Sequence, residues 1–288
     1  MSGFSSIAEL VSLAETQAIA LSEVVWRQEC ERSGWPPEAV WREMASRLAV
    51  MQQAAAEGIG RREKSISGLT GGDAWRLAAG GFLGPVVSEA AAKAVAVSEV
   101  NAGMGRIVAC PTAGSCGIVP GALLAVGSSL GCGEDKLVRA LFTAAGIGEV
   151  IAANATVAGA VGGCQAECGS AAAMAAAAAV ELLGGAPRQS AAAAALALKN
   201  LLGLACDPVA GLVEVPCVKR NGFAAVHALL AAQMALAGVT SVIPADEVVA
   251  AMRDIGDRMP CSLKETSEAG LAQTPTAVAI QTRLTEGK

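Results

Sequence analysis

The sequence predicts an all-α protein: a compact bundle of helices rich in small residues, with glycine-rich loops and a helical hairpin at the N-terminus. Hydrophobic residues make up 53% of the 288 residues, whereas aromatic residues make up 3% and tyrosine is absent. Alanine and glycine dominate in place of the aromatic and β-branched residues that favour strands. From Gly133 onward the chain reads as one helix after another, and no segment is predicted as a strand. Side chains this small let helices pack at short distances.

Residues 1–60 are predicted as the outer helical hairpin and form the most charged part of the chain. Ser5 and Ser6 can cap a first helix, which we expect to continue to about Arg32. The Ser33–Pro37 stretch then breaks it, and Pro37 can occupy the first turn of a second helix. We interpret the hairpin as scaffold. The whole chain, 1–288, is predicted as a single domain, with a core over 61–265 and an irregular tail over 266–288.

Composition also bears on the class of partner. The formal charge is −5 and the basic residues form no stripe, so we expect no nucleic-acid partner. The stretch 223–243 carries no Asp, Glu, Lys or Arg and is long enough to span a bilayer. However, it contains His227, Gln233 and Thr240 and lacks Trp or Tyr at its edges, so we predict a buried helix and no membrane association. A small-helix membrane transporter stays as an alternative. Without a visible secretory signal, we expect a cytoplasmic protein.

Two loops combine glycine with hydroxyl side chains. Glycine lets backbone amides approach a ligand closely, and hydroxyls supply directional hydrogen bonds, so each loop is a candidate for binding a carboxylate or phosphate. A flexible link is the equally weighted alternative for the first loop. Ser115 lacks the Gly-x-Ser-x-Gly pattern, and His227 is the only histidine, so a Ser-His-Asp triad is not predicted. The candidate binding residues are Ser67, Gly68, Thr70, Gly71, Thr112, Ser115 and Gly117.

Three cysteines stand out between residues 162 and 221: Cys164, Cys206 and Cys217. The loop between the last two contains prolines and glycine and therefore cannot be an ordinary helix. Together with a cysteine at a helix end, such a loop can bind three corners of an iron–sulfur cluster. Zinc is the rival, with Cys168 as a possible fourth ligand. On spacing alone, buried free thiols are as good an interpretation as a metal site.

Five motifs, in this order, resemble the iron–sulfur-dependent bacterial L-serine dehydratases. They are KSISGLTGGDA, SEVNAGMGRIVACPTAGSCGIVPG, GGCQAECGSAAAMAAAA, CDPVAGLVEVPCVKRN and MPCSLKETSEAGLA, and the resemblance covers residues 4–275. It implies a 4Fe-4S cluster held by Cys164, Cys206 and Cys217, with one iron left open for substrate and no pyridoxal phosphate. In relatives, apolar residues often stand where this chain has Cys168 and Cys110, so the resemblance marks both as non-ligands.

The resemblance also implies an activity and a partner. L-Serine would lose water by α,β-elimination, and hydrolysis of the resulting imine would give pyruvate and ammonia. Many relatives carry a regulatory-type domain before this one, so we expect the α chain of a two-chain enzyme that pairs with a separate β chain. Some single-chain relatives end in a cysteine that reaches the active site. This chain ends in Glu286, Gly287 and Lys288, so we expect no such capping.

Residues for substrate and proton transfer are less well defined. The two Gly/hydroxyl loops are the candidates for holding the substrate carboxylate and amino group, with Asn154 as a weaker one. Lys219, two residues after a cluster cysteine, is the candidate base, although it is equally interpretable as a solvated ion pair; a base from the partner chain is a further alternative. His227 is interpreted as a core residue. The other class of function is a non-catalytic helical subunit whose cysteines bind structural zinc.

Overall fold

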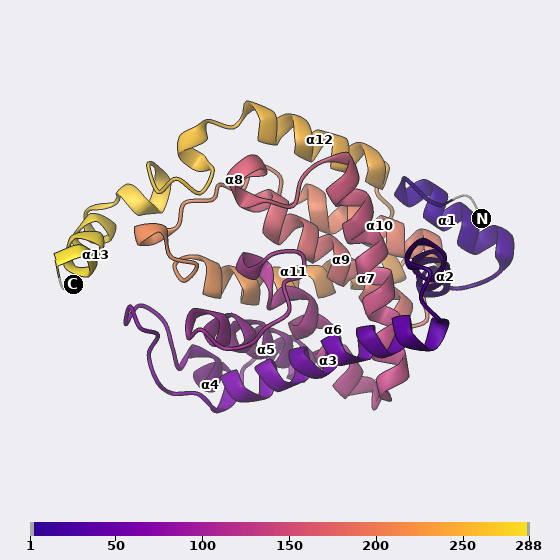
Figure 1. Cartoon of the computed structure of the whole chain (residues 1–288), viewed down its shortest axis with the longest axis horizontal. Coiled ribbons are helices and arrows are strands. Elements are labelled where there is room, and N and C mark those ends of the chain that lie inside the picture. The colour runs from indigo at the N-terminus through magenta and orange to yellow at the C-terminus, as the bar shows by residue number, and fades with distance from the viewer. Residues whose placement is uncertain (1–2, 287–288) are drawn as a thin grey trace.

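Helix α9 (Ser170–Leu182) lies at the centre of the molecule, which a computed structural model describes over residues 3–286. Its residues from Ser170 to Val180 are all buried, and most of them are alanine. The helices that contact it are α6 (Ile118–Leu130), α7 (Glu134–Asn154), α10 (Pro187–Lys199) and α11 (Cys217–Leu236) (Figure 1). Because alanine side chains are short, four neighbours can surround one helix closely.

The remaining elements complete an all-α fold, and that prediction is confirmed. Among the described residues, the one strand-like contact is an isolated bridge between Cys206 and Lys264. The other helices are α1 (Ile7–Gln17), α2 (Leu21–Ser33), α3 (Pro37–Gly60), α4 (Asp73–Ala78), α5 (Pro85–Ala102), α8 (Gly159–Gly162), α12 (Ala245–Arg258) and α13 (Pro275–Glu286). Short helical turns are η1 (Ala113–Ser115), η2 (Gln165–Gly169), η3 (Val209–Gly211), η4 (Cys261–Leu263) and η5 (Gly270–Gln273).

Helices α5 and α6 pack closely against each other at one side of α9. At their contact, a Cβ atom added to Gly121 would lie 2.6 Å from the Cβ of Ala94, so a larger residue would push the two helices apart. The pair fixes both ends of residues 103–117, which connect the helices and contain the second Gly/hydroxyl loop.

The N-terminal region has three helices where the sequence predicts a two-helix hairpin. The first helix ends at Gln17 because Ala18 adopts a left-handed conformation, with φ of 52°, and its N–H bonds to the carbonyls of Ala14 and Glu15. The expectation of one helix reaching Arg32 is therefore wrong. The break between Ser33 and Pro37 is confirmed, and α3 begins at Pro37.

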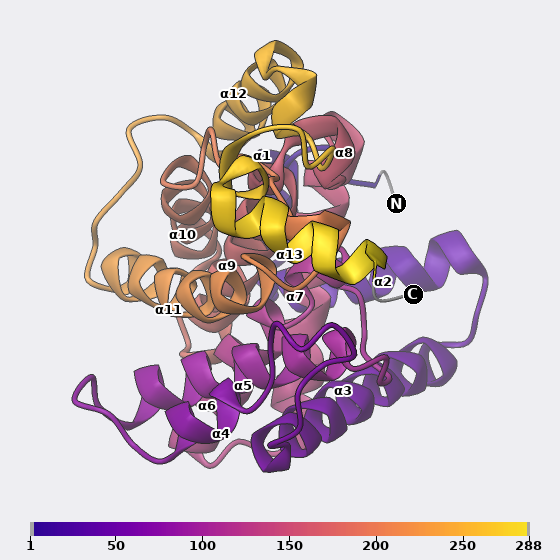
Figure 2. The same ribbon diagram turned by 90° about the vertical axis from the view of Figure 1, so that its left-hand side faces the viewer.

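The tail is more ordered than the sequence predicts. Helix α13 covers Pro275–Glu286, so the prediction of an irregular tail is wrong over that range. Thr274 Oγ1 accepts the Ala277 N–H at 3.4 Å, and a proline begins the helix, which together form an ordinary helix start. The helix contacts η3, and Figure 2 shows it crossing the face of the molecule in front of α9 and α11. Gly287 and Lys288 lie outside the described residues.

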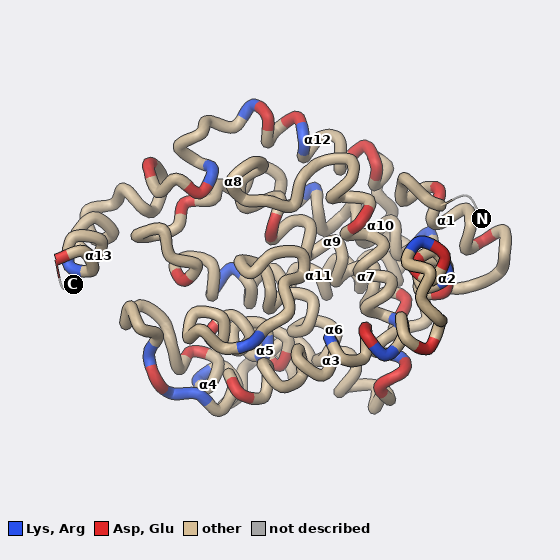
Figure 3. Tube along the Cα trace, in the orientation of Figure 1, with Lys and Arg blue, Asp and Glu red and all other residues tan. Residues whose placement is uncertain are grey.

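Two segments are long and apolar enough to cross a membrane, Ala113–Leu130 and Glu134–Asn154. They are 72% and 67% buried within the fold, as core helices of soluble proteins are. The 223–243 stretch is not one continuous helix, because α11 ends at Leu236. Charged residues follow outer helices such as α2, α3 and α12 and are sparse in the centre (Figure 3).

Candidate active site

The three predicted ligands come from three separate elements, and all are buried. Cys164 directly precedes η2, a π-helical turn at the start of α9. Cys206 lies in the loop before η3, and Cys217 is the first residue of α11. Gly163, with φ of 75°, introduces Cys164, and a Cβ there would lie 2.6 Å from Met259 Sδ. A π-turn inside a helical segment often marks a functional site.

The thiols of this group influence one another. Cys164 Sγ and Cys168 Sγ are 3.4 Å apart. Hydrogen bonds from the thiols of Cys168 and Cys206 hold the pKa of Cys164 well below its usual range, and the same contacts raise the pKa of both donors. Burial, followed by the charge of Cys164, raises the pKa of Cys217 to about 12. The three predicted ligands therefore lie in one electrostatic neighbourhood, together with Cys168.

The Cys206 segment is held by the C-terminal part of the chain. The Cys206 N–H donates to the Leu263 carbonyl at 2.8 Å, and its own carbonyl accepts the Glu265 N–H at 2.8 Å. The next residue, Asp207, accepts the Leu271 N–H at 2.8 Å and an Arg220 N–H at 3.0 Å. This clamp was not predicted, since no local pattern in 261–271 indicates contact with a loop more than fifty residues earlier.

Arg220 supplies positive charge beside these thiols. It donates to the Ala205 carbonyl at 2.8 Å and pairs with Asp207. Although burial acts to lower the pKa of Arg220, the negative charges of Cys164 and Asp207 raise it. A guanidinium held in this way stabilises anionic sulfur nearby.

The donor set is chemically suited to a thiolate-bound metal site. Among residues 3–286, no three His, Cys, Asp or Glu side chains are arranged to hold one metal ion. A structural zinc site needs four ligands within roughly 2.0–2.3 Å of the ion. Three buried thiols are the kind of donor that iron–sulfur clusters use.

The 112–117 loop, which contains η1, lies against these thiols. Asn221 on the first turn of α11 accepts the Gly117 N–H at 2.8 Å and donates to the carbonyls of Gly114 and Cys217 at 2.8 and 2.9 Å. One buried amide thus attaches the loop to the helix that begins with Cys217. Ser115 is buried and contacts Thr112 within the loop.

Glu167 is the residue that the sequence analysis missed. It lies on η2, is 8% exposed, and accepts a hydrogen bond from Thr112 Oγ1 at 2.6 Å. Its other oxygen is 3.8 Å from Cys206 Sγ. Burial raises the pKa of Glu167 to about 7. The only sequence signal was its place in GGCQAECG, one helical turn after Cys164.

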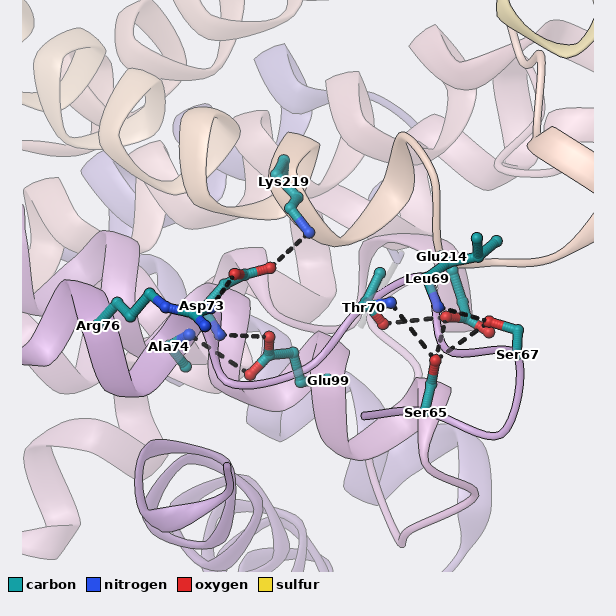
Figure 4. A network of polar contacts seen from close by, with 10 residues as sticks. All are labelled: Ser65, Ser67, Leu69, Thr70, Asp73, Ala74, Arg76, Glu99, Glu214 and Lys219. Carbon is teal, nitrogen blue, oxygen red and sulfur yellow. Dashed lines mark hydrogen bonds and ion pairs between the residues drawn. The ribbon is translucent and has the colours of Figure 1, made fainter. Parts of the chain in front are cut away.

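The 65–72 loop is organised around another buried carboxylate, Glu214. Ser65 Oγ and Thr70 Oγ1 donate to Glu214 Oε2 at 2.6 and 3.0 Å, and Ser67 Oγ lies 3.1 Å from Ser65 Oγ (Figure 4). Gly68 and Gly71 have φ of 78° and 124°, which lets the loop curl around the carboxylate. The predicted hydroxyls therefore meet a residue of the Cys206–Cys217 segment.

Lys219 points toward Asp73. Its Nζ is 2.6 Å from Asp73 Oδ2 and its side chain is 47% exposed, as a solvated ion pair would be (Figure 4). Asn154 donates to the carbonyls of Ser5 and Val150, both at 2.9 Å. His227 Nε2 is 2.9 Å from the Ala197 carbonyl. The structure brings neither Asn154 nor His227 into the contacts described above.

Comparison with known proteins identifies the family. The family model described as serine dehydratase alpha chain matches residues 16–272. The chain belongs to this family. It is 50% identical to a probable L-serine dehydratase, alpha chain, of Bacillus subtilis over 289 residues, covering 99% of this chain and 96% of that protein. It is 40% identical to the L-serine dehydratase, alpha chain, of Peptoniphilus asaccharolyticus, with 95% of each chain covered.

The share of a relative's own length that this chain matches differs between family members. The L-serine dehydratase of Streptomyces coelicolor is 39% identical over 92% of this chain, and the match covers 59% of that protein. The relatives from Bacillus and Peptoniphilus are covered almost entirely and are named alpha chains. In the length of sequence that is matched, this chain therefore resembles the relatives that are named alpha chains.

Proposed function

We propose that the chain is the α subunit of an L-serine dehydratase, which converts L-serine to pyruvate and ammonia by elimination of water. The observation that carries the proposal is the joint position of three buried cysteines and the Glu167 carboxylate, within the residues that the family model matches. The relatives from Bacillus and Peptoniphilus carry the name L-serine dehydratase, alpha chain, the former as a probable one, which supports the proposal. A lyase of this kind must hold the hydroxyl and remove the α-proton in one place.

Cys164, Cys206 and Cys217 are the proposed ligands of a 4Fe-4S cluster. Bound by these residues, the cluster would supply a Lewis acid that makes the serine hydroxyl a better leaving group, and pyridoxal phosphate would not be needed. Arg220 offsets part of the negative charge that the thiolates bring. Cys168 is proposed as a neighbour and not a ligand.

Glu167 is proposed as the group that accepts the substrate α-proton, in place of Lys219. One carboxylate oxygen is oriented by Thr112, and the other faces Cys206. A ligand thiolate has no proton to donate, so the oxygen facing Cys206 becomes available when that cysteine binds metal. Lys219 is already paired with Asp73 and largely solvated, which makes it a poorer acceptor.

The two Gly/hydroxyl loops are proposed as the walls of the substrate site. Ser67, Gly68, Thr70 and Gly71 belong to one wall, and Thr112, Ser115 and Gly117 belong to the other. Both walls are bonded to the segment that starts α11, through Glu214 and Asn221 respectively. The separate β chain and a cytoplasmic location are part of the same proposal.

The test is anaerobic reconstitution of the chain with its β chain, followed by iron and sulfide analysis and a pyruvate assay. We expect Cys164→Ala, Cys206→Ala and Cys217→Ala each to lose the cluster absorbance and the activity. Cys168→Ala is the matched control and should keep both. Zinc in place of iron and sulfide would instead support the structural-zinc subunit. Loss of the cluster in Cys168→Ala with retention in Cys164→Ala would overturn the ligand assignment.

A further inference from the structure

Glu214 is a buried carboxylate whose charge the protein does not balance. Its residue is 6% exposed, yet within residues 3–286 no lysine, arginine or histidine forms an ion pair with it. Burying a carboxylate without a cation is unfavourable unless hydrogen bonds or a bound cation compensate it. The neighbouring cation, Lys219, is engaged by Asp73.

The two oxygens of Glu214 are used differently. Oε2 accepts both loop hydroxyls, from Ser65 and Thr70. Oε1 accepts no hydrogen bond from any described residue. It also differs from the hydroxyls of Ser22, Ser170 and Ser190, which are fully buried without a partner, because it retains contact with solvent. Ser67 Oγ lies beside the same group and offers a second acceptor (Figure 4). One fixed carboxylate with a free oxygen and an adjacent hydroxyl is a receptor for a primary ammonium group.

The position of this receptor connects it with the proposed active site. The Glu214 carbonyl accepts the Val218 N–H at 3.0 Å, so Glu214 belongs to the turn that starts α11, next to Cys217. Asn221, one turn further along, holds the 112–117 loop that carries Thr112 and its bond to Glu167. Glu214 is thus joined directly to the start of α11, and Glu167 is joined to it through Thr112 and the loop that Asn221 holds.

We propose that Glu214 binds the α-ammonium group of the substrate through Oε1, with Ser67 as a second acceptor. The receptor makes the site selective for amino acids over hydroxy acids of the same shape. Ser65 and Thr70 are positioning residues, because they orient the carboxylate. This inference rests on the proposed function and divides the two loops: the 65–72 loop serves the amino group, and the 112–117 loop serves proton removal.

The test compares ligands with and without an amino group on the reconstituted, cluster-loaded α and β chains. Glu214→Gln should raise the KM for L-serine about 10- to 100-fold, the effect of losing a charged hydrogen bond. Inhibition by 3-hydroxypropionate, which lacks the amine, should change by less than about threefold, within the scatter of neutral substitutions. A structural role for Glu214 predicts instead that both ligands weaken together, and that result overturns the proposal.

A matched control and a wild-type measurement complete the experiment. Glu181 is a partly buried carboxylate on α9 that accepts Thr143 Oγ1 at 2.7 Å and the Ser22 N–H at 3.2 Å, so Glu181→Gln should leave the KM unchanged. In the wild-type enzyme, L-alanine should inhibit at least about tenfold more tightly than propionate. Equal inhibition overturns the proposal even if Glu214→Gln fails to fold. Absence of pyruvate formation by the wild-type enzyme refutes the proposed function itself, a different result.

Discussion

The 65–72 and 112–117 loops share one plan and differ in what they surround. In each loop, hydroxyl side chains donate to a buried glutamate from elsewhere in the chain: Ser65 and Thr70 to Glu214, and Thr112 to Glu167. Glu167 also faces Cys206 Sγ, whereas the Glu214 carboxylate accepts hydrogen bonds from the loop hydroxyls alone among described residues.

The difference indicates a division of labour. A carboxylate beside the proposed cluster ligands is placed for proton transfer, and a carboxylate with one free oxygen is placed for holding a cation. Thr70 and Thr112, which the sequence suggests as direct substrate ligands, instead donate their hydrogen bonds to a carboxylate and orient it, whereas Ser67 keeps a direct role in the proposed ammonium site. The two glutamates then contact the substrate, and the loop hydroxyls hold their carboxylates in place.

The largest expected effect is on kcat, and it distinguishes Glu167 from Glu214. Glu167→Gln should lower kcat by about 10²- to 10⁴-fold, the usual contribution of a positioned acid or base, with little change in KM. Glu214→Gln should act on KM. Pyruvate formation across serine concentrations gives both constants, and iron analysis checks that the cluster is retained. If Glu167→Gln keeps wild-type kcat with a full cluster, Glu167 is not the proton acceptor.

A smaller effect concerns how the 112–117 loop is held. Asn221→Ala removes three hydrogen bonds and leaves the buried Gly117 N–H without its partner. We expect the free energy of unfolding to fall by about 1–3 kcal/mol, the penalty for an unsatisfied buried group. Urea denaturation of both proteins measures it. Asn154→Ala, at an exposed amide, is the control and should change stability less; equal losses would show that Asn221 has no special part in attaching the loop.

The smallest expected effect is at Lys219. Its ion pair with Asp73 is solvated, and such pairs contribute about 0–1 kcal/mol. Lys219→Met should therefore change kcat by less than about fivefold, equivalent to under about 1 kcal/mol. Steady-state assays on enzyme with a full cluster measure this. A large loss of kcat under those conditions would indicate that Lys219 is the base, and it would contradict the assignment of proton removal to Glu167 at the 112–117 loop.

Much of the architecture could be predicted from local patterns. Small-residue composition predicted the all-α class, and the Ser33–Pro37 stretch predicted a correct break. Proline restricts φ wherever it stands, and glycine permits the left-handed conformation that ends a helix, as Gly34 does here. The helix boundary at Ala18 could not be predicted, since alanine carries no signal for a left-handed conformation. The helix that begins at Pro275 could have been predicted, because Thr274 is a helix-capping residue and Pro275 suits the first turn of a helix. The prediction of an irregular tail did not use these two residues.

For the site, the sequence by itself determined the inventory: three cysteines in an unusual setting and two loops of glycine and hydroxyl residues. The tertiary structure decided the partners. Thr112 meets Glu167 across 55 residues of chain, and Ser65 meets Glu214 across 149. Hydrophobic periodicity is a local property and survives in the sequence, whereas the pairing of two polar groups depends on where packing brings their backbones. The two buried carboxylates therefore became visible only once the helices around α9 were in place.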